Sequence, residues 1–541
     1  MSEIDVVGQS LGPFGKWQLR STLLIYLVKI PAAWFMACLI FTARTPTSEE
    51  IYCKPSYEVK NITAWIEAAH RKRFNNIENE ESINFCLVKK NVTDEIEINS
   101  ENVTHTFVEC AGFEHRPTFN SIIHEYGLIC SREALVALSQ SVHLFGVLLG
   151  GLIAYYMLKS ISPRRVMVIG MIAQIFLGPL TGFAPNYELH LLFRCSAAAT
   201  CSMMCIGIMI VADITSGKYR IIGVCLFEQF WSIGVILLPA VSSWWSLWST
   251  TYIAITIPTV PLIMLWYYIP DSPRWLLKHG RVDEALQVLK DAARVNGKTD
   301  FSEDDMYKKL AELAERMRYD PPEPTLLSIW KVPAKIRLRF VVAHIGWSVY
   351  LMCYYASLLN VRAMGRRYLQ VNTVLAGVSE IVGTFIALFL ILKTGRKWTY
   401  MSQLNIALSL IAYSANYLPH NYPPLERTIV YMAAAMLFKV AISTSINMFL
   451  TSMAEIVQPD KRKMFNHSGV TCSRTFVIIA PFIGYFVVYG QFVPQTIMCV
   501  MSICSSLLIA IFIKTPRTIP INVKTTVPLD EKQVIESFIK K

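Results

Sequence analysis

Charged side chains are scarce in this sequence: they make up 17% of its 541 residues, whereas hydrophobic residues make up 53%. The mean hydropathy is positive, at +0.39. A soluble domain of this length carries more charge, because water must solvate its surface. The composition therefore excludes an ordinary soluble protein and indicates a membrane protein.

Signatures of catalysis and of cofactor binding are also missing. The Gly-Lys-Thr string at 297–299 lacks the glycine that a phosphate loop requires five residues earlier, where Ala292 stands. The His-Glu pair at 124–125 begins a zinc-binding string, but Leu128 replaces its second histidine. Glycine-rich dinucleotide turns and nucleophile elbows are absent too. We therefore predict no enzyme, no cofactor and no metal site.

Long apolar runs fill most of the chain. A helix needs about 20 apolar residues to cross the hydrocarbon core of a bilayer, and its backbone polar groups must bond within the segment. The first run follows Lys16 and Arg20 but is longer than the apolar core of a signal peptide, so we interpret it as a retained helix. The runs that meet the length are 21–41, 134–156, 166–184, 189–212, 221–243, 248–269, 338–358, 371–392, 398–417, 427–449, 469–489 and 492–513.

Lysine and arginine gather in alternate connections between these twelve runs. They lie before the first run, in the turn at 159–165, in the long 270–337 segment and in the C-terminal tail, whereas the connections near Asn186, Ser243 and Gly490 have none. The connection after the seventh run is a basic exception. Because cytoplasmic loops collect positive charge, both termini are predicted to be cytoplasmic. This orientation explains the net charge of +12 better than nucleic-acid binding does.

With that orientation, the segment 42–133 is a large extracellular loop. It carries three N-glycosylation sequons, at Asn61, Asn91 and Asn102. It also carries four cysteines, which favour two disulfides in an oxidising compartment. The sequence leaves all three pairings open. The four cysteines are Cys53, Cys86, Cys110 and Cys130.

The runs form two groups of six, and the two groups share a similar sequence motif. The string at 158–165 in the first group, LKS followed by RR, corresponds to LKT followed by RK at 392–397 in the second. Such internal symmetry is typical of repeat-built transporters. Between the groups, a Ser-Pro cap at 272–273 and an apolar stripe within 282–293 indicate cytoplasmic helices. The predicted domains are the first half 1–269 with its loop 42–133, the helical linker 270–337, the second half 338–513 and the tail 514–541.

Several motifs occur together along the chain. They are Gly12-Pro13-Phe14-Gly15, the DSPRWLLKHGR string from Asp271 to Arg281, Tyr354-Tyr355, Glu380, Gly395-Arg396, Lys439, Glu455 with Arg462, and Arg474 with Pro481. In combination, and over nearly the whole chain, they make the sequence similar to the organic cation, anion and carnitine transporter family of the major facilitator superfamily. The resemblance implies an all-α membrane protein whose twelve transmembrane helices form two six-helix halves, which rock about a central site by alternating access.

The resemblance also implies a cytoplasmic gate. The loop between the second and third runs matches the superfamily's gating motif at Arg164 and Arg165, but Ser160 stands at the motif's acidic position. Two hypotheses follow for the neighbouring Lys159: it pairs with Asp213 in a latch of reversed polarity, or it serves membrane orientation only. The gating residues implied in this way are Lys159, Arg164, Asp213, Arg220, Arg396, Glu455 and Arg462.

Five charged residues lie inside the predicted spans, where a charge costs about 2.5–3.5 kcal/mol or more. Each is therefore either a substrate contact or half of a structural pair. Lys29 and Glu228 look unusual for the family, whereas Lys439 is common to its cation and anion members. Since aromatic faces can also hold a cation, the candidate substrate-binding residues are Lys29, Glu228, Glu380, Lys439, Arg474, Trp347, Tyr354 and Tyr355.

Arg474 bears on the charge of the substrate. In the family, cation carriers tend to have aspartate at this position, whereas anion and carnitine carriers have arginine, which can bind a carboxylate through two parallel hydrogen bonds. The anion carriers' lysine in the eighth span is replaced here by Thr384. One cation beside acidic and aromatic groups suits a zwitterion. The open alternative is that Arg474 pairs with Glu455 or Glu380 as a structural bridge.

These features predict a secondary active transporter of small organic ions at the plasma membrane, with cations or carnitine-like or amino-acid-like zwitterions as substrates. Its partners are then the substrate, the bilayer, and a coupling ion such as sodium or a proton, or an exchanged solute. An organic anion exchanger is the alternative within the class. The altered gating loop favours a different alternative, a receptor or scaffold that does not transport.

The topology predicts that Asn61, Asn91 and Asn102 carry glycans and that the fourth sequon, at Asn466, does not, because only the first three face the lumen during synthesis. A glycosidase should shift the mobility of the wild-type protein on a gel but leave the triple Asn→Gln variant unchanged. A residual shift that disappears only when Asn466 is also changed would invert the topology.

Overall fold

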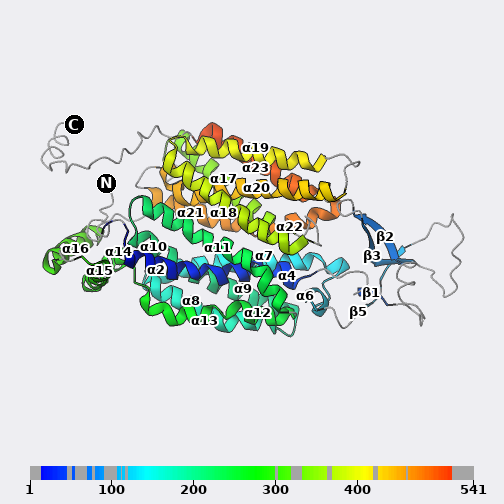
Figure 1. Cartoon of the computed structure of the whole chain (residues 1–541), viewed down its shortest axis with the longest axis horizontal. Coiled ribbons are helices and arrows are strands. Elements are labelled where there is room, and N and C mark those ends of the chain that lie inside the picture. Colours follow the sequence, from blue (N-terminus) through cyan, green and yellow to red (C-terminus); the bar gives the residue numbers. More distant parts are fainter. Residues whose placement is uncertain are drawn as a thin grey trace.

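The structure is a computed structural model. It describes residues 12, 14–44, 51–54, 70–75, 80–89, 107–110, 112–115, 120–245, 247–298, 302–318, 332–361, 368–417, 424–457, 461–490 and 492–513. The sequons at Asn61, Asn91 and Asn102 and the tail 514–541 lie outside these residues. Long helices run side by side along the long axis of the molecule, and the strands gather at one end (Figure 1).

The apolar runs of the first half form six helical segments, some of which are broken within the span. These segments are α2 (Lys16–Leu27) with α3 (Lys29–Ala37) and α4 (Leu39–Thr42); α7 (Ala134–Met157); α8 (Pro163–Gly182); α9 (Tyr187–Met204) with α10 (Gly207–Ile214); α11 (Lys218–Trp244); and α12 (Trp248–Thr256) with α13 (Thr259–Met264) and η2 (Leu265–Tyr268).

The second half also has six helical segments. Two of them begin four or more residues earlier than predicted, at Ala334 and Arg462, because the helix continues through polar residues beyond its apolar part. The segments are α17 (Ala334–Leu359); α18 (Leu369–Lys393); α19 (Lys397–Ser414) with η6 (Ala415–Tyr417); α20 (Pro424–Ser452) with η7 (Met453–Ile456); α21 (Arg462–Val477) with α22 (Ala480–Tyr485) and η9 (Phe486–Tyr489); and α23 (Val493–Phe512).

Ten of these segments are long and apolar enough, by length and composition, to cross a membrane. The segments 397–417 and 462–489 are not among the ten, and polar residues interrupt both of them. Both still pack inside the bundle, α19 against α20 and α23, and α21 against α17. The described helices are therefore consistent with the predicted twelve-helix fold.

Two helix breaks place cations at irregular points of the bundle. The first segment breaks at Val28, next to Lys29, because Pro31 has no N–H for the carbonyl four residues earlier. Pro481 follows a similar break between α21 and α22. Arg474 consequently lies in the last turn of α21, where the negative end of the helix dipole favours a cation.

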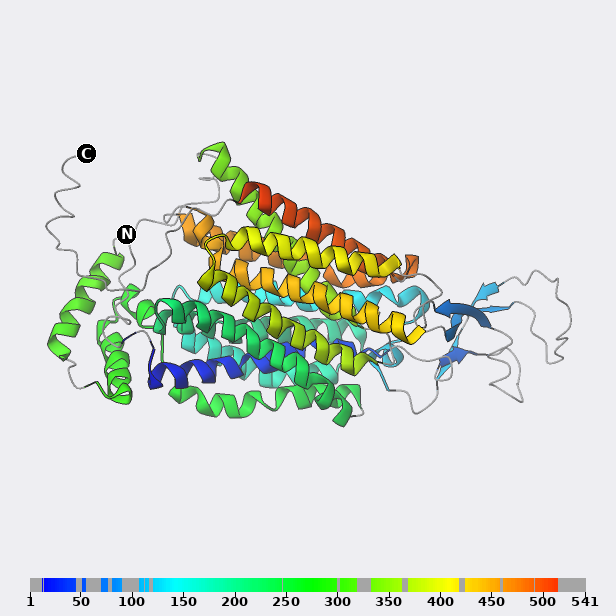
Figure 2. The same cartoon turned by 45° about the horizontal axis from the view of Figure 1, so that its top comes forward.

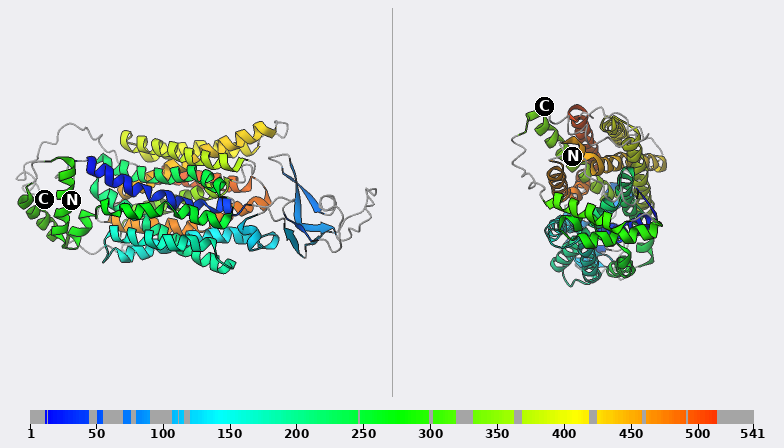
Figure 3. Two further views of the ribbon diagram at one scale, coloured as in Figure 1. Left: turned by 60° about the horizontal axis from the view of Figure 1, so that its bottom comes forward. Right: turned by 90° about the vertical axis from the view of Figure 1, so that its left-hand side faces the viewer.

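The halves meet along α11 and α18, and where α7 packs against α21 and α22. Gly377 of α18 lets the first of these pairs approach closely, since a Cβ there would lie 2.6 Å from Ile236 of α11. Near the end that carries the strands, Gln370 donates a hydrogen bond of 2.8 Å to the hydroxyl of Ser243. Figure 2 shows the helices of the second half, mostly yellow to red, above most of the blue to green helices of the first, and the right-hand view of Figure 3 shows the two groups end on.

The segment 42–133 contains strands, which the sequence pattern did not indicate. The spans themselves are helical, which confirms the predicted fold class, and the strands of the described residues all lie in this loop. β1 pairs antiparallel with β5 in one sheet, and β3 lies between β2 and β4 in the other. The elements of the segment are β1 (Ile51–Cys53), β2 (His70–Asn75), β3 (Glu80–Lys89), β4 (Phe107–Glu109), β5 (Phe113–His115), α6 (Ile122–Glu125) and η1 (Cys130–Arg132).

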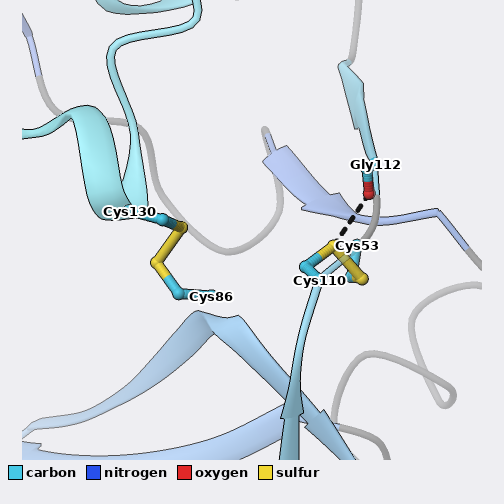
Figure 4. Close-up of a disulfide and its surroundings, with 5 residues drawn as sticks. All are labelled: Cys53, Cys86, Cys110, Gly112 and Cys130. Carbon is cyan, nitrogen blue, oxygen red and sulfur yellow. Dashed lines mark hydrogen bonds between the residues drawn. A yellow bond between two sulfur atoms is a disulfide. The ribbon is translucent and has the colours of Figure 1, made fainter.

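Two disulfides hold these sheets together (Figure 4). Cys53 pairs with Cys110, with their Cα atoms 5.7 Å apart, and Cys86 pairs with Cys130 at 5.5 Å. The first bridge joins β1 to the turn before β5, and the second ties β3 to η1, directly before α7. Of the three pairings that the sequence left open, the structure has this one.

The described residues of the linker form three helices, which lie at the opposite end from the strands (Figure 1). The Ser272 hydroxyl caps the first by accepting a hydrogen bond of 3.0 Å from the backbone N–H of Trp275. The indole N–H of Trp275 donates to the carbonyl of Leu158 at 2.8 Å, which fastens the linker to the first half. The helices are α14 (Pro273–Lys278), α15 (Val282–Asn296) and α16 (Glu303–Arg318).

The disulfide pairing predicts specific cross-linked peptides. Proteolysis without reduction, followed by mass spectrometry, should recover Cys53 joined to Cys110 and Cys86 joined to Cys130, and reduction should separate both. Cys86→Ser should lower the amount of surface protein as much as Cys86→Ser with Cys130→Ser, because both variants lose the same bridge, typically about 2–4 kcal/mol. A Cys53–Cys86 peptide would contradict the pairing.

Candidate functional site

A cavity lies in the middle of the bundle, between the two halves. Its volume of about 140 Å³ is several times the roughly 30 Å³ that one water occupies. Side chains of α3, α7 and α11 from the first half and of α17, α18, α20 and α21 from the second line it. Among its lining residues are most of the predicted substrate contacts: Lys29, Glu228, Trp347, Tyr354, Tyr355, Glu380 and Arg474.

Lys29 of α3 and Glu228 of α11 form an ion pair at the cavity wall. The ammonium Nζ of Lys29 lies 3.0 Å from Oε1 of Glu228. It also lies 4.5 Å from the ring centroid of Phe227 and 5.5 Å from that of Trp231. The Glu228 side chain is 29% exposed and that of Lys29 is 11% exposed. The Glu228 side chain is therefore the more exposed of the two.

Lys439 of α20 does not line the cavity but lies behind it, paired with Glu380 of α18. Its Nζ is 2.9 Å from Oε1 of Glu380, and both side chains are almost fully buried, with 3% and 2% exposed. The hydroxyl of Ser232 donates to Oε2 of Glu380 at 2.9 Å. The Lys439 ammonium also donates to the carbonyl of Tyr354 at 3.1 Å and lies 3.8 Å from its ring centroid. Both charges of this pair are thus satisfied inside the protein.

Arg474 of α21 faces the same cavity. The described residues place no acidic side chain in a salt bridge with it, since Glu380 pairs with Lys439 and Glu455 pairs with Lys397. The predicted alternative of a structural bridge from Arg474 to either glutamate is therefore not formed in this structure. The reason is geometric: other helices bring lysines to both carboxylates.

Aromatic rings form much of the remaining wall. Tyr354 and Tyr355 meet edge to face at a centroid distance of 5.3 Å, and Tyr355 meets Trp231 in the same way at 6.4 Å. Trp347 lies nearly parallel to Phe449 at 6.2 Å. A cavity with ring faces and a few fixed polar groups is typical of sites for small organic molecules.

Sequence reasoning missed the uncharged polar residues of the cavity. Gln229 and Asn447 both donate to the hydroxyl of Thr384, at 2.6 and 2.9 Å. Their own side-chain oxygens, Oε1 and Oδ1, are buried without a hydrogen-bond partner among the described residues. The signal was present in the sequence, because an amide inside an apolar run needs a partner. Two buried acceptor oxygens beside the cavity thus have no hydrogen-bond partner among the described residues.

At the linker end of the first half, the predicted latch between Lys159 and Asp213 is replaced by other contacts. The Lys159 ammonium lies over the ring of Tyr156, 4.8 Å from its centroid. The Asp213 carboxylate accepts a hydrogen bond of 2.6 Å from the hydroxyl of Ser272 in the linker. Of the two hypotheses for Lys159, the pair with Asp213 is therefore not formed in this conformation, because Lys159 follows the end of α7 and lies over the ring of Tyr156, whereas Asp213 faces the linker.

The two arginines predicted for this gate contact backbone carbonyls. Arg164 lies 4.4 Å from the ring centroid of Trp266 and donates to the Trp266 carbonyl at 3.4 Å. Arg220 donates to the carbonyl of Ala212 at 2.7 Å. Arg164 therefore ties α8 to η2, and Arg220 ties α11 to α10. These are contacts that hold helix ends in place at the linker side of the first half.

In the second half, Glu455 pairs with Lys397 at 2.6 Å, and Lys397 also donates to the Ser452 hydroxyl at 3.1 Å. Arg396 precedes α19 and Arg462 begins α21, and both are exposed. The structure thus joins the start of α19 to the end of α20. Within the described residues, no cluster of three or more histidine, cysteine, aspartate or glutamate side chains could hold a metal ion.

Comparison with known proteins identifies the fold and the family. The sequence profile described as "Sugar (and other) transporter" matches residues 78–525. The organic cation transporter protein of Drosophila melanogaster is 27% identical over 93% of this chain and 90% of its own length. The organic cation/carnitine transporter 2 of Rattus norvegicus is 24% identical over 95% and 91%.

Solved structures agree with this comparison at the level of the fold. A partially occluded inward-open conformation of the xylose transporter XylE from E. coli has a TM-score of 0.60 at 14% identity, and the match covers 94% of this chain and 100% of that one. The family profile covers most of the chain, and its curated relatives are transporters. The chain therefore belongs to the sugar (and other) transporter family of the major facilitator superfamily, and it is a membrane-spanning transporter rather than an enzyme.

Proposed function

We propose that this transporter carries small organic ions across the plasma membrane by secondary active alternating access, and that its substrates are zwitterions of the carnitine or amino-acid type. The observation that carries the proposal is Arg474, a cation that faces the cavity without an acidic partner among the described residues. A guanidinium in this setting offers two parallel N–H donors to a carboxylate. A coupling ion such as sodium or a proton, or an exchanged solute, drives the transport.

The charges around the cavity support a substrate that brings a negative group. Three cations, Lys29, Lys439 and Arg474, stand against two acids, Glu228 and Glu380, so the net charge of this group is +1. Since the lysines are paired, the excess resides at Arg474. A carboxylate neutralises it, whereas a substrate with only positive charge meets repulsion.

The position of the cavity supports alternating access. Both halves line it, and they touch through a small number of helices, so a rocking motion changes few contacts. On α20 the lining residues run from Ser443 to Leu450, toward the helix end at Ser452, which is the end nearest the linker. The cavity therefore extends from the middle of the bundle toward the predicted cytoplasmic side.

An organic anion exchanger is the second candidate, and the charge of +1 at the cavity favours it. The two candidates differ in whether a positive group on the substrate helps binding. The third candidate, a receptor or scaffold without transport, rested on the altered gating loop. In place of the missing acidic residue, the linker holds that loop, because Trp275 and His279 contact the carbonyls of Leu158 and Lys159.

Replacing the cavity arginine tests the carboxylate contact. Arg474→Ala should lower uptake of labelled carnitine about 10- to 100-fold at equal surface protein, because charge-assisted hydrogen bonds contribute roughly 1.5–3 kcal/mol. Arg474→Lys should recover only part of this, since lysine keeps the charge but not the paired donors. Arg316→Ala, on the exposed face of α16, is the matched control and should have no effect.

Uptake in oocytes, measured with and without a sodium gradient, separates the candidates. Zwitterion transport requires carnitine uptake above that of glutarate and of tetraethylammonium. Glutarate uptake above that of carnitine would replace the proposal by anion exchange. Protein at the surface that moves none of the three compounds would favour the receptor.

The buried pair behind the cavity should behave as a structural element. Glu380→Gln leaves the Lys439 ammonium buried without its counter-charge, which typically costs about 3–5 kcal/mol, so surface protein and thermal stability should fall. Lys439→Met combined with Glu380→Met removes both charges and should restore much of the surface protein. Thermal melting of detergent-solubilised protein measures the effect. A double variant less stable than the single one would show that the pair has no such role.

A further inference from the structure

Resting on the proposed function, we propose that Glu228 is the ammonium-binding group of the cavity, and that Lys29 occupies its place as a tethered ammonium until a substrate displaces it. Lys29 thereby excludes purely cationic compounds and admits zwitterions. The displaced group and the entering group have the same chemistry, a positively charged amine beside one carboxylate and two aromatic faces.

The surroundings of the Lys29 ammonium are those of a cation-binding site. One carboxylate oxygen lies 3.0 Å away, and the ring centroids of Phe227 and Trp231 lie 4.5 and 5.5 Å away. An acid with two ring faces binds substituted ammonium ions in proteins, through charge and through the negative faces of the rings. The position of the Lys29 ammonium therefore indicates that this wall of the cavity fits the ammonium group of a ligand.

The two lysine–glutamate pairs differ in a way that assigns this role to only one of them. Both oxygens of Glu380 are held, one by Lys439 and one by Ser232, and its side chain is 2% exposed. Glu228 is 29% exposed, and in the described part of the chain its contacts involve Oε1, with no hydrogen-bond partner at Oε2. Glu228 can therefore exchange its partner without first being uncovered.

The ammonium group and the carboxylate group of one small molecule can be held together here. Lys29, Glu228 and Arg474 all line the same cavity, together with Tyr355. The tethered pair and the unpaired guanidinium thus share one region of the cavity. A zwitterion that places its carboxylate on Arg474 brings its positive end close to Glu228.

Competition with a tethered group explains the selectivity. A group attached to the site has a high effective concentration, on the order of millimolar for short flexible tethers. A substrate must therefore offer more than its positive charge to displace Lys29. A zwitterion also gains the contact with Arg474, whereas tetraethylammonium gains no such contact and is repelled by the same side chain.

Removing the tethered ammonium tests the proposal. Lys29→Met should lower the KM for tetraethylammonium about tenfold, which corresponds to roughly 1.4 kcal/mol. Lys309→Met, on the exposed face of α16, is the control, because it removes one positive charge away from the cavity. A similar gain in Lys309→Met would assign the effect to overall charge and overturn the proposal, as would an unchanged KM in Lys29→Met at normal surface level. Adding Glu228→Gln to Lys29→Met should remove the gain.

A chemical variant makes the test independent of folding. Lys29→Cys, treated at the cell surface or in inside-out vesicles with 2-aminoethyl methanethiosulfonate, regains a side chain that ends in an ammonium. Tetraethylammonium uptake should be high before the reagent and return to the wild-type level after it, with treated wild-type protein as the control. Mass spectrometry measures the extent of labelling. Unchanged uptake after complete labelling would overturn the proposal.

The outcome is separable from that of the proposed function. The Lys29 experiments measure a cation that does not use Arg474, so they can succeed even if Arg474→Ala leaves carnitine uptake intact. Conversely, carnitine uptake that depends on Arg474 together with an unchanged cation KM in Lys29→Met would retain the carboxylate site and reject the tethered ammonium.

Discussion

A charge inside the bilayer must be neutralised within the protein, and much of the arrangement around the cavity follows from that constraint. Two salt bridges meet it, one joining α3 to α11 and the other joining α18 to α20. Both link segments about 60 or more residues apart in the sequence, and Lys29, Glu228 and Glu380 line one space. The cavity is the region in which these charges and Arg474 are gathered and screened from lipid.

The same interaction has different consequences at different depths. A fully buried pair is costly to break, because each partner would be left in a medium of low dielectric. The pair of Lys439 and Glu380 is of this kind, and it also fixes the backbone of α17 through the carbonyl of Tyr354. The pair of Lys29 and Glu228 is partly open to the cavity, so its partners can be exchanged at a lower cost. Burial, rather than residue type, separates a structural pair from a ligand-exchangeable one.

The linker is fastened to the first half by several hydrogen bonds. Asn296 at the end of α15 accepts a hydrogen bond of 2.9 Å from the backbone N–H of Trp17, and so satisfies a free donor at the start of α2. Ser272 reaches Asp213, and Trp275 reaches Leu158. These contacts hold the ends of several helices where the sequence of the gating loop lacks the usual acidic residue. Movement of the first half as one body is consistent with them.

The sequence by itself determined the spans, the long loop and the charged candidates, because length, hydropathy and isolated charges are local properties of a chain. Lys29, Glu228, Glu380 and Arg474 could be chosen without a structure, since each interrupts an apolar run. The helix starts at Ala334 and Arg462 could not be predicted from the sequence, because polar turns extend a helix without any apolar signal.

Only the tertiary structure decided which groups meet. Lys29 and Glu228 are in contact although they lie 199 residues apart in the sequence. No local sequence pattern indicates that contact. The same holds for the disulfide pairing, for Asp213 and Ser272, and for the open acceptors of Gln229 and Asn447. Partner choice depends on how rigid helices pack and rotate against one another, and that packing is a property of the whole fold.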